Sequence, residues 1–180
     1  MKDQKLQIQE EKTDTFYTAK TFKININELS DVNESNFHII FHILSKLSSP
    51  SIPKLIGLSL TNFSKEPNPT IITEFSPNGH LIEFLRKERK KIKSNSNFCR
   101  RKFIIIYGIA FSMNYIHNNS IVHRNLTPKS ILLDDSFNPK ISSFKHSILL
   151  NNNEKHYDSK VVGKAPYIAP EVWMNNEYSK

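Results

Sequence analysis

The sequence predicts an α+β fold with two unequal lobes, and three observations along the chain indicate it. A strand, one amphipathic helix and two further strands fill the first part of the chain, up to a Ser-Pro-Asn-Gly turn at 76–79. Two helical segments follow this turn. Short extended pieces then lie inside the helical half, with long loops after residue 120 that are typical of a functional cleft.

The strands of the first lobe follow from short apolar or aromatic runs. Residues 14–24 are rich in Thr and aromatic side chains, and the apolar runs 55–60 and 70–75 are separated by a polar loop that contains proline. Each of these patterns favours a β-strand. Residues 1–12 are polar and show no period, so we expect a flexible N-terminus there.

The helix of the first lobe is marked by its start, its period and its end. Asp31 and Glu34 form a capping-box-like start, and Ser-Ser-Pro at 48–50 ends the helix. Between them, apolar residues at i, i+3 and i+4 spacing predict an amphipathic helix of about four turns. These apolar residues are Phe37, Ile40, Phe41, Leu44 and Leu47.

The second lobe is predicted to contain two helices and three short strands. A short helix is expected at 80–91, and a longer one at 99–117 is apolar nearly all round. Such a helix is normally buried on most sides, and where nothing covers it, it exposes a large apolar patch. The extended pieces are 121–123, 131–133 and 139–142.

Composition excludes several classes of protein. The chain has 180 residues, of which 38 % are hydrophobic and 11 % aromatic, enough to build a core and to exclude full-length disorder. The single cysteine, Cys99, excludes an internal disulfide framework and a multi-cysteine zinc site. The N-terminus lacks an apolar signal segment, and the apolar run 103–111 is far shorter than the roughly 20 residues of a membrane span. We therefore expect a cytoplasmic protein that does not bind a membrane.

The net charge of the chain comes from one stretch. Residues 86–102 contain nine basic side chains and one Glu, a net charge of 9 − 1 = +8, which equals the net charge of the whole chain. A solvated helix end and loop would explain this stretch. The alternatives are a site for an anionic partner or a nuclear-import signal, which would make the location nuclear. No aromatic platform that stacks bases is interleaved, so specific nucleic-acid recognition is not expected.

Five segments resemble, in order and at similar spacing, the motifs of eukaryotic protein kinases. The segment 121–145, IVHRNLTPKSILLDDSFNPKISSFK, is similar to the catalytic loop and the metal-binding loop, where the family has HRDLKPEN and then DFG. GKAPYIAPE at 163–171 resembles G-T-x-x-Y-x-A-P-E. TEFSPNGHL at 73–81 is similar to the hinge between the lobes, most of all in tyrosine-kinase-like members. ILSKLSSPSIPKLIG at 43–57 resembles the end of the regulatory helix, and Tyr-Thr-Ala-Lys at 17–20 the V-A-I-K strand.

This resemblance implies a two-lobed protein-kinase-like fold with a small β-rich N-lobe and an incomplete helical C-lobe. The implied parts are a flexible N-terminus at 1–12, an N-lobe-like domain at 13–78 and a partial C-lobe at 79–180 that runs through the A-P-E motif. The sequence stops nine residues after Glu171, before the later helices of the family. We expect a fragment, a truncated reading frame or a decayed copy, or a lobe that another chain completes.

The catalytic-loop match departs from the family at its chemical positions. Asn125 stands where the family has the H-R-D aspartate, and a carboxamide cannot accept the hydroxyl proton of a substrate. Loss of a general base typically costs about 10²–10⁴ in rate. Thr127 replaces the catalytic-loop lysine, whereas Arg124 is retained and could pair with a phosphate at Tyr157 or Ser159.

The metal-binding positions of the family are also replaced. Ser130 stands at the metal-binding Asn, Ser143 at the DFG aspartate and Lys145 at the DFG glycine. Magnesium prefers hard oxygen ligands with at least one carboxylate, so two neutral hydroxyls are poor substitutes. The resemblance therefore predicts no magnesium binding at these positions.

The nucleotide positions of the first lobe are only partly retained. Lys20 matches the strand lysine, but its expected glutamate partner falls at Ile40, and a solvated strand lysine remains an equal interpretation. No G-x-G-x-x-G precedes Lys20, because Gly57 is the first glycine of the chain.

The hinge match implies backbone groups for an adenine at Glu74, Phe75 and Ser76, with Thr73 as gatekeeper and Leu132 packing beneath the ring. We expect ATP to bind weakly or not at all, without metal. Its dissociation constant is expected to be no tighter than the upper micromolar range, roughly −5 to −6 kcal/mol.

The leading hypothesis is a pseudokinase, a signalling module of kinase shape that binds protein partners without transferring phosphate. The apolar stack that couples the lobes in the family is matched by His123, Phe144 and Leu44, so the framework survives where the chemistry does not. Two alternatives stay open. One is an active or weakly active protein kinase that phosphorylates Ser, Thr or Tyr, and the other is a non-functional fragment. In an active kinase, the nearest replacement carboxylates would be Asp134, Asp135 and Asp158.

Overall fold

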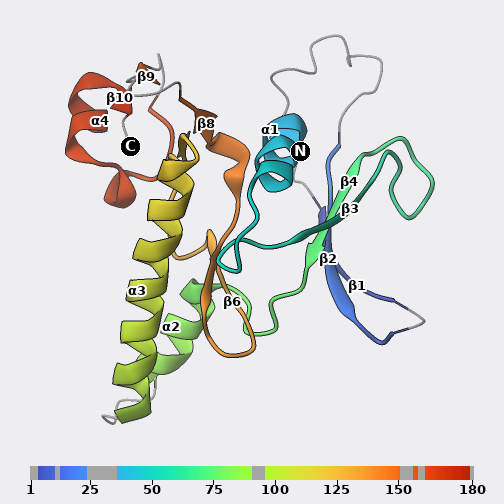
Figure 1. Ribbon diagram of the computed structural model, residues 1–180, viewed down its shortest axis with the longest axis horizontal. Helices are drawn as coiled ribbons and strands as arrows, with labels where there is room; N and C mark the ends of the chain where they lie inside the picture. Colours follow the sequence, from blue (N-terminus) through green and yellow to red (C-terminus); the bar gives the residue numbers. More distant parts are fainter. Residues whose placement is uncertain are drawn as a thin grey trace. The chain divides into compact units, whose positions relative to one another are not determined.

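The computed structural model describes residues 4–10, 13–23, 36–90, 96–150, 156–157 and 161–178 (Figure 1). These residues form two compact units, which divide between Phe75 and Ser76. The first unit is a small antiparallel sheet with one helix, and the second is mainly helical with short strand pairs. This is the α+β class that the sequence predicts. The domain boundary expected after residue 78 stays a prediction, three residues beyond the division between the units.

The first unit is built on a four-stranded sheet in the order β1-β2-β4-β3, and every neighbouring pair is antiparallel. The strands are β1 Gln4–Gln9, β2 Phe16–Thr21, β3 Leu55–Ser59 and β4 Thr70–Glu74. The last three are the strands expected from the sequence. Strand β1 lies in the segment expected to be flexible. Its main chain pairs with β2 along its whole length, and Leu6 and Ile8 alternate with polar residues.

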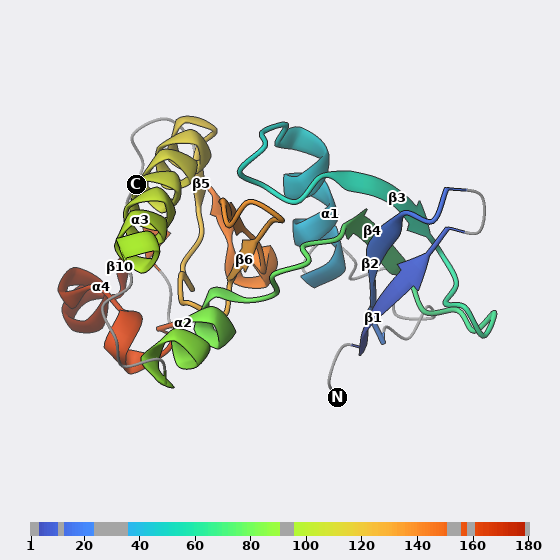
Figure 2. The ribbon, with the colours of Figure 1, turned by 90° about the horizontal axis from the view of Figure 1, so that it is seen from below.

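Helix α1, Asn36–Lys46, lies alongside this sheet (Figure 2). Four of the five predicted apolar residues are buried, three of them in α1 and Leu47 directly after it. Phe37 meets Phe22 edge-on with ring centroids 5.5 Å apart. The helix ends before Ser-Ser-Pro, as predicted, because a proline cannot continue it. The expected cap at Asp31 and Glu34 lies outside the described residues.

The second unit joins two long helices to short strand pairs. Its helices are α2 Leu81–Lys90, α3 Ser96–Asn118 and α4 Pro170–Asn175, with single 3₁₀ turns at Phe144–His146 and Ala165–Tyr167. Its strands pair as β5 Ile121–Val122 with β8 Ile148–Leu149, β6 Ile131–Leu133 with β7 Pro139–Ile141, and β9 His156–Tyr157 with β10 Glu177–Tyr178. Both predicted helices and all three predicted extended pieces are present.

The β6–β7 hairpin is held on two sides within this unit. The predicted turn at 76–79 closes with Gly79 N–H donating to Ser76 O at 3.1 Å, and Leu133 N–H donates to Gly79 O at 2.9 Å. On the other side α3 lies directly against β7. A Cβ atom added to Gly108 would come within 2.5 Å of Pro139 Cγ, so only glycine permits this approach of the helix.

Helix α3 is apolar on two opposite faces, and only one of them is covered. Ile105 and Ile116 are buried, whereas Phe103 and Tyr107 are each 74 % exposed and Ile106 is 64 % exposed. Burial is therefore confined to one side of this helix, and the apolar patch expected for an uncovered helix is present. Among the described residues, no helix is long and apolar enough to cross a membrane.

Candidate functional site

The loop 123–130 connects β5 to β6 and begins at a buried histidine. Asn125 N–H donates to His123 Nδ1 at 3.3 Å, so the ring carries its proton on Nε2 and donates it to Ser142 O at 2.9 Å. The ring also packs against Phe144, with centroids 5.3 Å apart. Burial lowers the pKa of His123 below 6.5, and nearby His146 lowers it further, against the hydrogen bond to Ser142 that raises it. His123 is thus held as a neutral framework residue.

The loop is closed by the hydroxyl of Ser130. Thr127 N–H donates to Ser130 Oγ at 2.8 Å, and this hydroxyl donates to Thr127 O at 2.8 Å or to Asn125 O at 3.2 Å. Ser130 is only 2 % exposed, and Thr127 is also buried. These bonds form because a serine hydroxyl readily satisfies main-chain groups a few residues away. The oxygen at this position therefore faces the protein main chain.

Asn125 lies in the middle of this closed loop. Its side-chain Oδ1 is buried and has no hydrogen-bond partner among the described residues. A carboxylate at the same place would bury a negative charge, which costs more than burying an amide oxygen. The local surroundings therefore suit a neutral side chain.

Ser143 follows β7 and adopts a left-handed backbone, with φ 68° and ψ 45°. Its side chain is exposed and makes no capping hydrogen bond to the 3₁₀ turn that it precedes. Phe144, the next residue, is 1 % exposed, while Lys145 is exposed. The turn thus directs an aromatic ring inward and a lysine outward.

The two described carboxylates predicted as replacements, Asp134 and Asp135, organise the β6–β7 turn. Asp134 Oδ1 accepts hydrogen bonds from Ser136 N–H at 3.0 Å and Asn138 N–H at 2.8 Å, and Asp135 Oδ1 accepts from Ser136 N–H at 2.8 Å. Asp158 lies outside the described residues. Within the described ranges, no group of three or more His, Cys, Asp or Glu side chains could hold a metal ion.

The predicted nucleotide lysine lies in the first unit. Lys20 is on β2, and its Nζ lies 4.5 Å from the ring centroid of Phe22. Ile40, at the position of the family's glutamate, is buried in α1. An isoleucine cannot form an ion pair, so the pairing that the family uses is missing at this position.

The predicted hinge residues lie at the end of strand β4 and directly after it. Thr73 and Glu74 are the last residues of β4, where Glu74 N–H donates to Lys54 O at 3.0 Å and Glu74 Oε1 accepts from Lys54 N–H at 2.9 Å. Phe75 packs against Phe16 with ring centroids 6.0 Å apart. In the second unit, Ser76 has a buried Oγ without a hydrogen-bond partner in the described structure, and Leu132 is buried in β6. The structure thus divides the predicted adenine positions between the two units.

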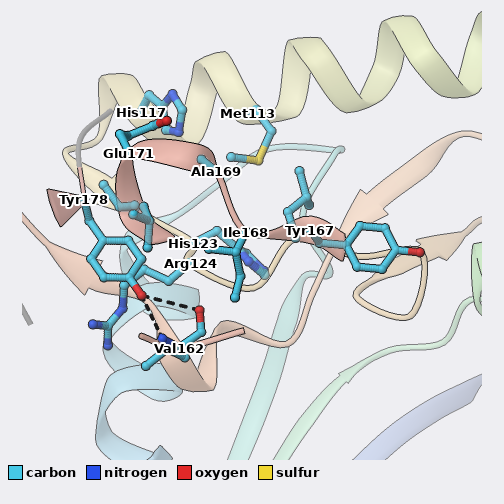
Figure 3. A pocket seen from close by; sticks show the side chains of 13 residues that line it. Met113, His117, His123, Arg124, Val162, Tyr167, Ile168, Ala169, Glu171 and Tyr178 are labelled. Carbon is cyan, nitrogen blue, oxygen red and sulfur yellow. Dashed lines mark hydrogen bonds between the residues drawn. The ribbon is translucent and has the colours of Figure 1, made fainter. Parts of the chain in front are cut away.

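Arg124 lies beside a pocket of about 160 Å³ in the second unit (Figure 3). Its Nε–H donates to His146 O, and its guanidinium carbon lies 5.2 Å from the ring centroid of Tyr178. The side chain of Tyr157 and all of Ser159 lie outside the described residues, so their predicted pairing with Arg124 stays untested. Around Arg124, the pocket is lined by α3, the segment 162–169, α4, β10 and residues 122–126. Residues 122–126, which comprise the end of β5 and the first part of the loop 123–130, are called the 122–126 loop below.

Comparison with known proteins identifies the family. The family described as protein tyrosine and serine/threonine kinase matches residues 5–180, nearly the whole chain. The chain belongs to the protein kinase family. A cysteine-rich receptor-like protein kinase 19 of Arabidopsis thaliana is 32 % identical over 158 residues, covering 86 % of this chain and 23 % of the relative. A protein of Dictyostelium discoideum named as a serine/threonine-protein kinase is 33 % identical over 161 residues, covering 88 % of this chain and 16 % of the relative.

The chain therefore spans between 16 % and 23 % of the length of these two relatives. A G-type lectin S-receptor-like serine/threonine-protein kinase of Arabidopsis thaliana has a similar relation, 33 % identity over 142 residues, covering 77 % of this chain and 16 % of the relative. The match supports kinase-domain shape for this chain, which agrees with the observed α+β architecture.

Within this kinase domain, the structure brings Asn125, Thr127 and Ser130 together in one closed loop. Arg124, in the same loop, and Ser143, after β7, both have left-handed backbones. The sequence analysis missed Tyr178, which contacts Arg124. A lone tyrosine after a short helix carries no periodic signal, and only its burial in the folded unit reveals it.

Proposed function

We propose that this kinase domain is a pseudokinase, which keeps the fold of the family as a binding and regulatory module and does not transfer phosphate. The observation that carries the proposal is the hydroxyl of Ser130. It bonds the main chain of its own loop on both its donor and its acceptor side, at 2.8 Å to Thr127. A hydroxyl held in this way is a poor ligand for magnesium, which requires well-placed oxygen atoms and usually a carboxylate.

Two further positions support the same proposal. Asn125 offers a neutral amide where a general base would accept a proton, and its Oδ1 lies in a buried site. Ser143 offers a neutral, exposed hydroxyl where the family has a metal-binding carboxylate. Phosphoryl transfer depends on positioning and on charge neutralisation by metal, so the combined loss would leave turnover near background.

A weakly active kinase remains the alternative, with carboxylates recruited from nearby. Asp134 and Asp135 are the described candidates, and the hydrogen bonds of both to the β6–β7 turn argue against their recruitment. Moving either carboxylate to the loop would break the turn. This cost is the physical reason for preferring the pseudokinase.

A phosphotransfer assay tests the proposal directly. The full 180-residue chain, incubated with radiolabelled ATP, magnesium and a general protein substrate, is expected to incorporate no label above a protein-free blank. Lys20→Ala is the matched control, since it removes the predicted nucleotide lysine. Incorporation by the native chain that Lys20→Ala abolishes would refute the pseudokinase. Cooperative melting, followed through the single tryptophan Trp173, separates true inactivity from a fragment that does not fold.

A restored variant sharpens the test. Ser130→Asn combined with Ser143→Asp returns the two metal-ligand types of the family, and we expect magnesium to raise the melting temperature of this variant in the presence of ATP. The native chain and a Ser136→Asp control, altered on the exposed turn, are expected to show no magnesium-dependent shift. An equal shift in the native chain would contradict the proposed loss of the metal site.

We further propose that ATP binds only weakly and without metal, through the main chain at Glu74, Phe75 and Ser76. This binding does not need the replaced side chains. Isothermal titration calorimetry is expected to give a dissociation constant in the upper micromolar range or weaker, with or without magnesium. Saturable nanomolar binding would contradict this part of the proposal.

The basic ends of α2 and α3 are proposed as a docking surface for an acidic protein partner. Their described basic side chains are mostly exposed, and they outnumber the two glutamates of α2, while α3 contains no Asp or Glu. The exposed basic residues are Arg86, Lys87, Arg89, Arg100 and Lys102. An acidic protein segment would complement this excess of positive charge. We propose a cytoplasmic location for the domain.

Fluorescence anisotropy with a labelled poly-glutamate peptide tests this surface. Binding is expected to weaken at high salt and to fall at least tenfold in Arg100→Glu with Lys102→Glu, because two attractive charges become repulsive. Lys54→Glu with Lys65→Glu is the matched control, since both of these lysines are exposed on the first unit. Equal losses in the two double variants would mean that binding follows net charge alone and would refute a defined surface.

A further inference from the structure

Tyr178 is an unexpected member of the core of the second unit. It is 4 % exposed and packs with Val122, Leu150 and Val172, which come from three other parts of the chain. Partly buried Val161 and Ile168 pack against the same cluster. A single aromatic side chain thus joins the start of the 122–126 loop, helix α4 and the segment 161–169.

The hydroxyl of Tyr178 holds the main chain of this segment. Val162 N–H donates to Tyr178 Oη at 2.8 Å, and the same hydroxyl donates to Val162 O at 3.4 Å (Figure 3). Together the two contacts engage both polar groups of one residue. A buried hydroxyl that accepts from one main-chain group and donates to another has both of its roles filled.

The ring of Tyr178 faces Arg124. The guanidinium carbon lies 5.2 Å from the ring centroid, within the range of a cation–π contact, and Arg124 Nε–H donates to the main-chain oxygen of His146. Gly163, the residue after Val162, allows the segment to approach the main chain of Arg124 closely. A Cβ atom there would lie 3.3 Å from Arg124 O, and the φ of 126° also favours glycine.

We propose that Tyr178 anchors the segment 161–169 against the 122–126 loop without a phosphate group. An arginine that orders a loop by binding a phosphate needs the modification before the loop can settle. Here an aromatic face and a main-chain carbonyl are among the partners of Arg124, and both are present in the unmodified chain. The segment is therefore ordered constitutively. This inference goes beyond the proposed function, because it holds whether or not the domain transfers phosphate.

Amide hydrogen exchange of the full chain, treated with phosphatase and verified by intact mass, tests the anchor. In Tyr178→Phe the ring and its packing remain and only the hydroxyl is lost. We expect exchange at the amide of Val162 to become about tenfold faster, the equivalent of one hydrogen bond. Exchange at Leu133 and Ser142, in and beside the β6–β7 hairpin, should stay within about twofold of the native value.

Tyr167→Phe is the matched control, because Tyr167 lies on the same segment but is 52 % exposed. It should leave exchange at Val162 unchanged. Tyr178→Leu, which also removes the ring from Arg124, should accelerate exchange along the whole of 161–169. The anchor is overturned if Tyr178→Phe leaves Val162 unaffected, or if all amides of the unit accelerate together. Fast exchange along 161–169 in the dephosphorylated native chain would equally overturn it, whereas the phosphotransfer assay bears only on catalysis.

Discussion

The loop 123–130 and the turn 134–138 lie at opposite ends of strand β6, and they use polar side chains in contrasting ways. The loop has an amide and hydroxyls, with Ser130 bonded to its own main chain. The turn has the carboxylates, and Asp134 is bonded to its own main chain as well. Negative charge is thus present near the candidate site, but it stabilises a turn.

This difference shows that the number of polar side chains near a site does not indicate whether the site can bind a metal or catalyse a reaction. What counts is whether an oxygen atom remains available to a substrate or a metal. At both ends of β6 side-chain oxygens accept hydrogen bonds from main-chain N–H groups, namely Ser130 in the loop and Asp134 and Asp135 in the turn. Such N–H groups are costly to leave unpaired when buried. Both regions are therefore best understood as parts of the scaffold, and the following predictions test this from the largest expected effect to the smallest.

Ser130→Ala is expected to have the largest effect. It leaves the buried Thr127 N–H without its partner, so the free energy of unfolding should fall by about 2 kcal/mol. Urea denaturation followed through Trp173 measures the loss, and Ser136→Ala on the exposed turn is the control, expected to cost less than about 0.5 kcal/mol. A loss no larger than that of the control would mean that the hydroxyl does not close the loop.

Acid should destabilise the second unit through His123. Burial lowers the pKa of this ring in the folded protein below 6.5, so the unfolded chain binds a proton more readily. The stability that the neutral ring provides is therefore complete above about pH 6.5 and is lost progressively as the pH falls below it. Titration of the ring by NMR is expected to give a pKa below 6.5. A value above 6.5 would contradict the neutral framework role.

Asp134→Ala should cost less than Ser130→Ala, because the turn is closer to solvent. Loss of the carboxylate removes the acceptor for the amides of Ser136 and Asn138, and we expect a fall of about 1 kcal/mol in the free energy of unfolding. Asp135→Ala is the control with fewer bonds. If Asp134→Ala instead abolishes a phosphotransfer activity, the weakly active kinase is the better explanation.

Ser143→Gly is expected to stabilise the protein slightly. The left-handed φ of 68° is unfavourable for serine and neutral for glycine. Relief of this strain should add about 0.5 kcal/mol, partly offset by the greater flexibility of glycine in the unfolded chain. Ser136→Gly, at a residue without a positive φ, should destabilise the protein in the same thermal melt.

Most of the fold could be predicted from the sequence, because the spacing of apolar residues and the residues that end helices and form turns indicate the same elements. Helix α1 has its apolar stripe and its Ser-Ser-Pro end, and the turn at 76–79 has its Pro and Gly. Strand β1 was missed because its two apolar residues lie among charged and amide side chains. Its place is set by pairing with β2, a long-range contact that no local pattern contains.

For the candidate site, the order of the motifs predicted which residues stand at the family's catalytic and metal-binding positions. The structure added the hydrogen bonds and contacts that these residues make. Nothing in the sequence indicates that Ser130 closes its own loop or that Tyr178 meets Arg124. Both depend on main-chain atoms brought close by folding. Helix α3 shows a different limit of sequence-based prediction. Its apolar residues are typical of a helix buried on most sides, but the described structure covers only one face.

The contact between Gly108 and Pro139 has a mechanical consequence. With no side chain between them, the backbone of α3 and the ring of the β7 proline meet without slack. A ligand that tilted α3 from its open side would therefore push the hairpin and, through Ser142, the histidine ring beside it. Gly108 is thus the point at which a displacement of α3 would be transmitted to the interior of the second unit.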